Sequence, residues 1–143
     1  MLAETFAEDG IRFRYPSHWQ LERNDNEDGW TVSIQSPDTA FLMLALNTEM
    51  PTIEELADTA LGALREEYPD LEADEIVEPL AGQPAIGHDI RFFSFDLTNT
   101  CWTRSFYSPY GTVLLLCQVN DLEEDSNEPI LRAICQSLEV TEE

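Results

Sequence analysis

The sequence predicts an α+β fold in which helices cover the faces of a mainly antiparallel sheet. Segments of strand type outnumber those of helix type, and short turns join most of them. In residues 111–119, GTVLLLCQV, apolar side chains point to both sides, with Val113 and Leu115 on one side and Leu114 on the other. Such a strand is buried on both faces, so the sheet has layers packed above and below it. For a chain of 143 residues we expect one domain, spanning residues 1–143.

The N-terminal third of the chain has the pattern of successive strands. Apolar and charged residues alternate over residues 11–15, and a second short strand begins at Trp19. The polar run 24–29, NDNEDG, favours a turn, after which the alternation resumes over residues 30–35. Residues 41–46, FLMLAL, are apolar on both sides and are the second candidate for an interior strand.

The clearest helix signal follows these strands. Thr52 and Glu55 have the spacing of a capping box, in which each side chain reaches an otherwise unpaired backbone N–H. Apolar residues then recur at helical spacing as far as Leu64, and Pro69 ends the helix. The very acidic residues 71–77 fit an edge strand, where charge discourages unwanted pairing.

The C-terminal half predicts a turn, two further strands and a closing helix. Residues 79–84, PLAGQP, form the turn, and residues 85–97 form one long strand. A strand over residues 102–107 leads through the turn 108–111, SPYG, into the central strand. After the acidic segment 121–129 comes a helix whose apolar residues are Ile130, Leu131, Ile134 and, at its end, Leu138.

The charge of the chain is its most unusual property. There are 29 acidic and 7 basic residues, which gives a net charge of −22. Such a surface repels nucleic acids and anionic membranes, so we expect neither as a partner, and it attracts basic proteins. The alternative is that the acidity serves solubility alone, or life in a salty or acidic setting.

Three short motifs give the chain a family resemblance. Phe13-Arg14-Tyr15-Pro16 followed by Trp19 resembles the opening signature of the PsbP-like superfamily. Residues 79–85, PLAGQPA, are similar to its glycine turn, and residues 137–140, SLEV, are similar to its closing segment. The resemblance covers residues 6–140. That superfamily includes photosystem II extrinsic subunits, Ran-binding nuclear-transport proteins, DcrB-like proteins and type VI secretion effector chaperones.

The resemblance implies an α/β/α sandwich and a non-enzymatic module that binds or assembles other proteins. It does not choose among the tasks of the superfamily, because a fold does not fix a function. The first residues, MLAETFAEDG, have no basic segment followed by an apolar run, so we expect no secretory signal or lipid anchor and a cytoplasmic location.

We find no catalytic, metal or cofactor motif, and expect neither an enzyme nor a cofactor. His18 and His88 fit a turn and a strand better than a catalytic base. The three cysteines, Cys101, Cys117 and Cys135, have no metal-ligand spacing and fit reduced core thiols. An EF-hand echo begins at Asn24, but the required twelfth-position glutamate is replaced by glutamine, and a hairpin loop is the better interpretation.

Two surface features remain as candidate partner-binding sites. Tyr107 and Tyr110, with Arg104 nearby, combine residue types that are enriched at interfaces. Trp102 and Phe106, in the same strand, fit packing under a helix at least as well. The second feature is an acidic docking face, whose candidate residues are Glu66, Glu67, Asp70 and Glu72. They belong to an acidic run that continues through Asp74, Glu75 and Glu78 and is repeated in residues 121–128. The alternative is a solvated helix end and sheet edge.

The sequence therefore predicts a non-enzymatic protein-binding adaptor or chaperone-like module with a strongly acidic surface. We expect its partner to be another protein, of basic character, and the association to weaken with salt. One alternative is a small-ligand-binding or enzymatic protein that uses a pocket between sheet and helix. Another is an inhibitor that masks a basic enzyme, which fits the charge but has no motif.

Overall fold

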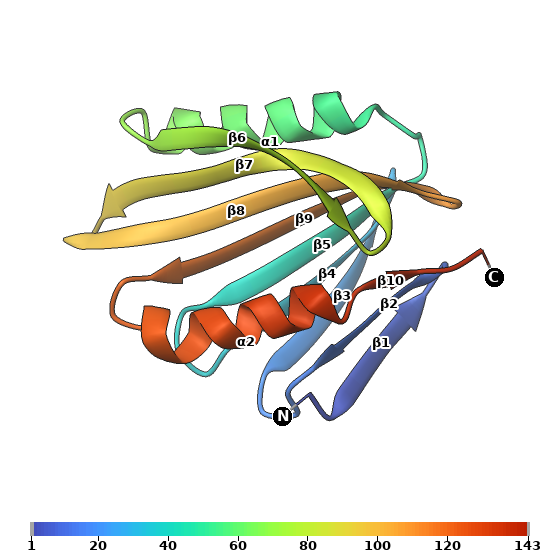
Figure 1. Ribbon diagram of the computed structural model, residues 1–143, viewed down its shortest axis with the longest axis horizontal. Helices are drawn as coiled ribbons and strands as arrows, with labels where there is room; N and C mark the ends of the chain where they lie inside the picture. Colours follow the sequence, from blue (N-terminus) through green and yellow to red (C-terminus); the bar gives the residue numbers. More distant parts are fainter. Residues whose placement is uncertain (1, 143) are drawn as a thin grey trace.

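A large antiparallel sheet forms the centre of the computed structural model, which describes residues 2–142 (Figure 1). Its strand order is β3-β4-β5-β9-β8-β7-β6, so the apolar strand β9 lies in the middle. The strands are β3 (Gln20–Asn26), β4 (Gly29–Gln35), β5 (Phe41–Asn47), β6 (Glu72–Leu80), β7 (Gln83–Ser94), β8 (Leu97–Ser108) and β9 (Gly111–Asn120).

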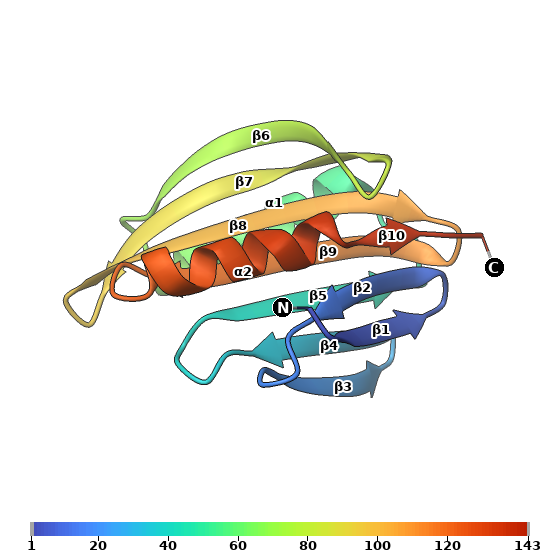
Figure 2. The same cartoon turned by 60° about the horizontal axis from the view of Figure 1, so that its bottom comes forward.

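One helix lies on each face of this sheet. Helix α1 (Ile53–Glu67) packs against β7, β8 and β9 on one face. Helix α2 (Glu124–Gln136) contacts β9 and β2 on the other face, beside a small sheet of order β1-β2-β10 (Figure 2). The small sheet consists of β1 (Glu4–Glu8), β2 (Ile11–Tyr15) and β10 (Glu139–Val140). The predicted α+β class, with helices on both faces of an antiparallel sheet, is confirmed.

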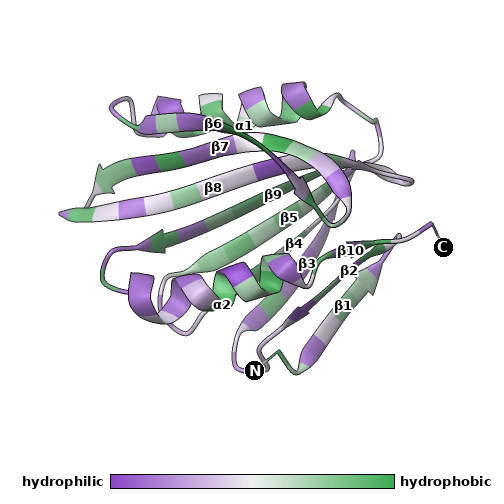
Figure 3. Ribbon diagram, in the orientation of Figure 1, coloured by the Kyte–Doolittle hydropathy of each residue, from purple (hydrophilic) through white to green (hydrophobic). Residues whose placement is uncertain are grey.

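The core is built on the central strand as its sequence predicts. Val113, Leu115 and Cys117 are buried on the α2 face, and Leu114 and Leu116 are half-buried on the α1 face. The neighbouring strand β5 repeats this pattern and is coloured hydrophobic along much of its length in Figure 3. Because β5 and β9 are covered on both faces, they lack the alternation of apolar and polar residues seen in the strands at the edges of the sheet.

Helix α1 begins where the capping signal lies. The Thr52 hydroxyl accepts a hydrogen bond from the Glu55 backbone N–H at 3.0 Å, which satisfies one unpaired donor of the first turn. At the other end Tyr68 stacks on Phe92 of β7, with ring centroids 3.9 Å apart. These two contacts fix the helix at both ends. The predicted acidic strand follows as β6, which begins at Glu72 and lies at the edge of the sheet.

Several boundaries differ from those that the sequence predicts. The strand expected over residues 85–97 ends at Ser94, because Phe95 and Asp96 form a tight hairpin turn with φ angles of 54° and 61°. Phenylalanine is rare in left-handed backbone, so the turn gives no sequence signal. The loops expected over residues 79–84 and 24–29 are shorter than predicted, because strand pairing continues to Leu80 and Gln83 and to Asn26 and Gly29. The sequence analysis also did not predict strands β1 and β10.

Candidate functional site

A groove lies between helix α2 and the outer strands of the sheet. Helix α2 covers β9 and reaches Trp102 of β8 through Arg132, but it lies away from the same face of β6 and β7 (Figures 1 and 2). Two adjoining hollows, of about 230 and 310 Å³, follow this gap and share Trp102 and Arg132. We call it the carboxylate groove; its charged residues are Glu72, Asp74, Glu78, Asp89, Arg91, Arg104, Glu124, Glu128 and Arg132.

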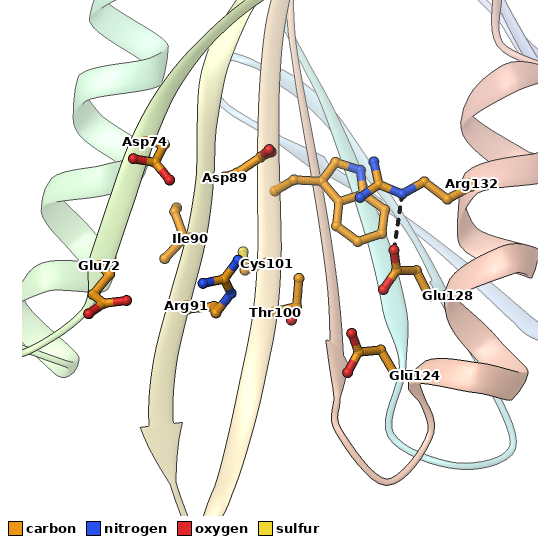
Figure 4. A pocket seen from close by; sticks show the side chains of 11 residues that line it. Glu72, Asp74, Asp89, Ile90, Arg91, Thr100, Cys101, Glu124, Glu128 and Arg132 are labelled. Atoms are coloured by element: carbon orange, nitrogen blue, oxygen red, sulfur yellow. Dashed lines mark ion pairs between the residues drawn. The ribbon is translucent and has the colours of Figure 1, made fainter.

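Strand register brings the groove residues of the sheet together. Asp89 lies opposite Asp74 on one side and opposite Trp102 on the other. Side chains of opposite residues in adjacent strands point to the same face, and so do those two positions along in each strand. Figure 4 shows the result, with Glu72 and Asp74 on the sheet and Glu124 and Glu128 on α2 across the hollow.

Arg104 is the buried charge at the centre of the site. Only 3% of the surface of Arg104 is exposed to solvent. Its Nε donates to Glu78 at 2.7 Å, one terminal nitrogen donates to Asp89 at 2.9 Å, and the other donates to the Thr103 carbonyl at 2.7 Å. Burial lowers the pKa of Arg104, but the Glu78 and Asp89 carboxylates outweigh it and hold the pKa above its ordinary value. Arg104 is therefore a fixed charge that organises two carboxylates.

A glycine beside Arg104 lets strands β7 and β8 approach closely. Gly87 is the register partner of Arg104 on β7, the strand that its side chain has to cross to meet Glu78. A Cβ atom at Gly87 would lie 1.7 Å from the Thr103 carbonyl oxygen. No other residue fits there without a shift of the backbone, so Gly87 fits the close approach of β7 and β8.

Arg132 forms the opposite wall of the groove. Its guanidinium lies 3.8 Å from the centroid of the Trp102 ring and 3.5 Å from the Glu128 carboxylate, one turn earlier in α2. This contact ties the helix to the sheet at the point where the two hollows meet.

The groove keeps an excess of negative charge after its internal pairs are formed. Within residues 2–142, Glu72, Asp74 and Glu124 take part in no ion pair. These three carboxylates lie at the end of the groove where α2 begins and β6 starts. Their free oxygens can accept hydrogen bonds from guanidinium or ammonium groups.

The sequence-predicted candidates are divided between separate places. Glu72 and Arg104 line the groove. Tyr107 follows Arg104 by three positions in β8, so it points to the α1 face, where its hydroxyl accepts from the Ile53 backbone N–H at 3.3 Å. Tyr110 lies in the turn after β8, against Gly10. The structure does not bring Arg104 together with these tyrosines.

The acidic candidates are divided in the same way. Glu66, Glu67 and Asp70 lie exposed at the C-terminal end of α1 and in the turn after it, on the other side of the sheet from α2. Of the four candidate residues only Glu72 belongs to the groove. Asp74 and Glu78 of the same acidic run join it, because their period-two spacing places all three on one face of β6.

The sequence reasoning missed an exposed apolar end of the groove. Phe93 lies on the groove face two positions beyond Arg91, and Leu122 precedes α2 at the same end. Both are exposed, and Phe95 in the adjacent turn is 96% exposed. The missed β7–β8 turn is the reason for Phe95, which a strand through residue 97 would have placed on one face of the sheet.

Among the remaining candidates, Cys101 packs in the core cluster beneath α1 and also borders the hollow of about 230 Å³. Burial, with a smaller contribution from Asp89, raises the pKa of the Cys101 thiol to about 12. The His88 backbone N–H donates to Thr103 at 3.1 Å, while its buried Nδ1 has no hydrogen-bond partner in the described residues. In residues 2–142 there is no group of three or more His, Cys, Asp and Glu placed to hold a metal ion. Neither described helix is long and apolar enough to cross a membrane.

Comparison with known proteins rests on structure alone. No protein-family model and no curated protein sequence matches this chain. Among solved structures it is similar to cyanobacterial PsbP (CyanoP) from Synechocystis sp. PCC 6803, with a TM-score of 0.62 and 11% identity over 96% of this chain and 92% of that one. The fold is PsbP-like.

Two further structures support this fold. LpqN, described as involved in cell envelope biogenesis of Mycobacterium tuberculosis, matches with a TM-score of 0.62 and 15% identity over 92% of this chain and 83% of that one. A Bacteroides thetaiotaomicron VPI-5482 protein matches with a TM-score of 0.61 and 14% identity over 100% of this chain and 50% of that one. Identities this low establish a shared PsbP-like fold and leave function to the site.

The structure also brings together two of the three motifs that resemble the PsbP-like superfamily. The Arg14 backbone N–H, in the first motif, donates to the Ser137 hydroxyl, in the last, at 2.8 Å. Phe13 and Trp19 are buried in the core below α2 and the small sheet. The two motifs at the ends of the PsbP-like fold therefore meet and close the small sheet.

Proposed function

We propose that this protein is a non-enzymatic protein-binding module that takes a positively charged, extended segment of another protein into the carboxylate groove. The observation that carries the proposal is the row of three carboxylates without ion pairs, Glu72, Asp74 and Glu124, beside an open strand face. Arg91 lies opposite Glu72 on β7 and offsets one of these charges. A bound Lys or Arg side chain would supply the remaining counter-charge.

The apolar end of the groove gives such a segment a point of attachment. Charge alone yields fast but weakly specific association, whereas a buried aromatic contact supplies most of the binding energy of many interfaces. Phe93 and Leu122 lie exposed beside the free carboxylates. The preferred ligand is therefore a basic segment that carries an apolar side chain at one end.

The test uses a fluorescein-labelled peptide, Leu-Phe-Arg-Lys-Arg-Lys, and fluorescence polarisation at increasing NaCl. In the groove variant, Glu72→Gln, Asp74→Asn and Glu124→Gln are combined. We expect this variant to bind the peptide at least about tenfold more weakly than the unchanged protein, since it loses the unpaired carboxylates. The affinity of the unchanged protein should fall as salt rises.

A matched variant separates the groove from the general acidity of the chain. Glu66→Gln, Glu67→Gln and Asp70→Asn remove the same amount of charge from the α1 end of the molecule, where the sequence also predicts a docking face. We expect this variant to bind within about twofold of the unchanged protein, because distant exposed charges are screened. Equal losses in the two variants would mean that the peptide senses only net charge and would overturn the proposal.

A small-ligand site is the second candidate, and the hollow near Arg104 favours it. This hollow, about 310 Å³, is lined by Arg104, Arg132 and Trp102, and so has cationic and aromatic groups for a small planar anion. Benzoate and related aromatic carboxylates, tested by thermal shift, would raise the melting temperature of the unchanged protein. No shift across that series would exclude this candidate.

A further inference from the structure

Two thiols meet at the far end of the carboxylate groove. Cys117 lies in β9 on the α2 face, and Cys135 lies in the last turn of α2. Their sulfur atoms are 3.6 Å apart. A disulfide bond is about 2.05 Å long, so the two sulfurs have to approach by about 1.5 Å to form one. The pair is the one sulfur–sulfur hydrogen bond in residues 2–142.

The two thiols differ in access to solvent. Cys117 is fully buried in the core, whereas Cys135 is partly exposed and lines the hollow that also contains Trp102, Arg104 and Arg132. A reagent that enters the groove therefore meets Cys135 first. Cys101 is buried in the core cluster on the opposite face of the sheet; it borders the adjoining hollow of about 230 Å³ and not the one that Cys135 lines.

The two thiols also differ in acidity. The hydrogen bond with Cys117 lowers the pKa of Cys135; burial opposes this, while the Trp102 indole and the Arg132 and Arg104 guanidinium groups reinforce it. Burial raises the pKa of Cys117. A thiolate is the nucleophile in disulfide exchange, so Cys135 has the surroundings of an attacking thiol and Cys117 those of a resolving thiol.

We propose that Cys135 and Cys117 form a redox-active dithiol that exchanges with low-molecular-weight disulfides entering the groove. The Cys135 thiolate attacks one sulfur of the incoming disulfide, forms a mixed disulfide and releases one thiolate. Cys117 then attacks the Cys135 sulfur, forms the Cys117–Cys135 bond and releases the second. The two protons of the protein thiols pass to the released thiolates, and the two electrons pass from the protein to the disulfide.

The product links helix α2 covalently to the central strand. Helix α2 carries Glu124, Glu128 and Arg132, which form one wall of the groove. A bond between its last turn and β9 closes a loop of the chain from residue 117 to residue 135 and restricts the unfolded state. Oxidation would therefore raise the thermal unfolding temperature and hold this wall in place.

The test is incubation of the reduced, folded protein with oxidised glutathione, followed by alkylation of free thiols in denaturant and mass spectrometry. We expect the unchanged protein to pass from three alkylated cysteines to one, Cys101, with a Cys117–Cys135 cross-linked peptide. The Cys101→Ala variant should form the same cross-link. A protein that keeps three free thiols, or that links Cys101 to either of the others, would overturn the proposal.

Single variants test the order of the two steps. Cys117→Ser keeps a hydroxyl donor beside Cys135, and we expect it to stop at one glutathione adduct on Cys135. That adduct should form at least about tenfold faster than any adduct on Cys101 of the same protein. Cys135→Ser should form no adduct on Cys117. Cys117→Ala, with a smaller change in polarity, serves if the serine variant does not fold. Equal or slower reaction of Cys135 in the variant that folds would contradict the assignment.

Discussion

The guanidinium carbon of Arg132 lies over the indole of Trp102, 3.8 Å from the centroid of the ring. Trp102 belongs to β8 and Arg132 to α2, so this contact joins the two walls of the carboxylate groove across its middle. The same guanidinium faces Glu128 at 3.5 Å. It therefore both holds the helix to the sheet and neutralises part of the groove.

Replacement of Arg132 by Gln should lower the stability of the protein and raise its affinity for the basic peptide. We expect the free energy of unfolding to fall by about 0.5–1 kcal/mol, since one partly exposed cation–π contact is lost. The proposed basic peptide should bind about two- to fivefold more tightly, because Glu128 is freed and the groove becomes more negative. Urea denaturation and fluorescence polarisation measure the two effects. Weaker peptide binding would contradict the assignment of the groove.

Replacement of Arg104 by Met should be much more costly. Arg104 is buried, while Glu78 and Asp89 are each 47% exposed and would remain as an uncompensated pair of carboxylates. We expect a loss of about 2–4 kcal/mol in the free energy of unfolding, measured by urea denaturation. Arg12→Met is the control, because its pair with Glu139 is exposed and the expected loss is below about 1 kcal/mol. Similar losses in both variants would refute a central role for Arg104.

Glu123 should make the stability of the protein depend on pH. Its buried carboxylate accepts hydrogen bonds from the Thr39 and Ala40 backbone N–H groups, each at 3.1 Å, and from Asn127 at 2.8 Å. Burial raises the pKa of Glu123, but these hydrogen bonds and that of the Thr39 hydroxyl outweigh it and lower the pKa overall. The stabilisation is therefore present above the unfolded pKa, about 4.3, and is lost as the pH falls through the folded value.

The Glu123→Gln variant measures this effect. We expect it to be less stable than the unchanged protein by about 1–3 kcal/mol at pH 7 in urea denaturation. The difference should shrink as the pH falls below about 4, where Glu123 of the unchanged protein becomes protonated. Glu124→Gln, at the exposed neighbouring position, should show a small difference at every pH. A constant difference for Glu123→Gln would contradict the lowered pKa.

Replacement of Phe95 by Asn should stabilise the protein. Phe95 occupies left-handed backbone, with φ of 54°, and is 96% exposed, so it pays a conformational cost without burial. Asparagine tolerates this conformation, and we expect a gain of about 0.5–1 kcal/mol in thermal or urea unfolding. The control is Phe93→Asn, an exposed position within β7, which should give no gain. Destabilisation by Phe95→Asn would show that the ring makes contacts that stabilise the folded chain.

The sequence alone determined the central strand, its buried neighbour and the helix that starts after Thr52. These elements depend on short-range patterns: apolar residues on both sides of residues 113–117, or a capping residue followed by apolar residues at helical spacing. It also placed the acidic strand at an edge, because a row of charges cannot lie between two layers. Three motifs were enough to indicate the PsbP-like fold.

Tertiary structure decided which charges meet. Glu78, Asp89 and Arg104 come from three strands, and their contact depends on the register of two hairpins, one of which turns at Phe95 without a glycine or asparagine. The groove exists because α2 packs over β9 and lies away from β6 and β7. The packing of α2 over β9 also brings Cys117 and Cys135 together. Propensity and periodicity act over a few residues, whereas register and helix placement depend on packing of the whole chain, which no local pattern contains.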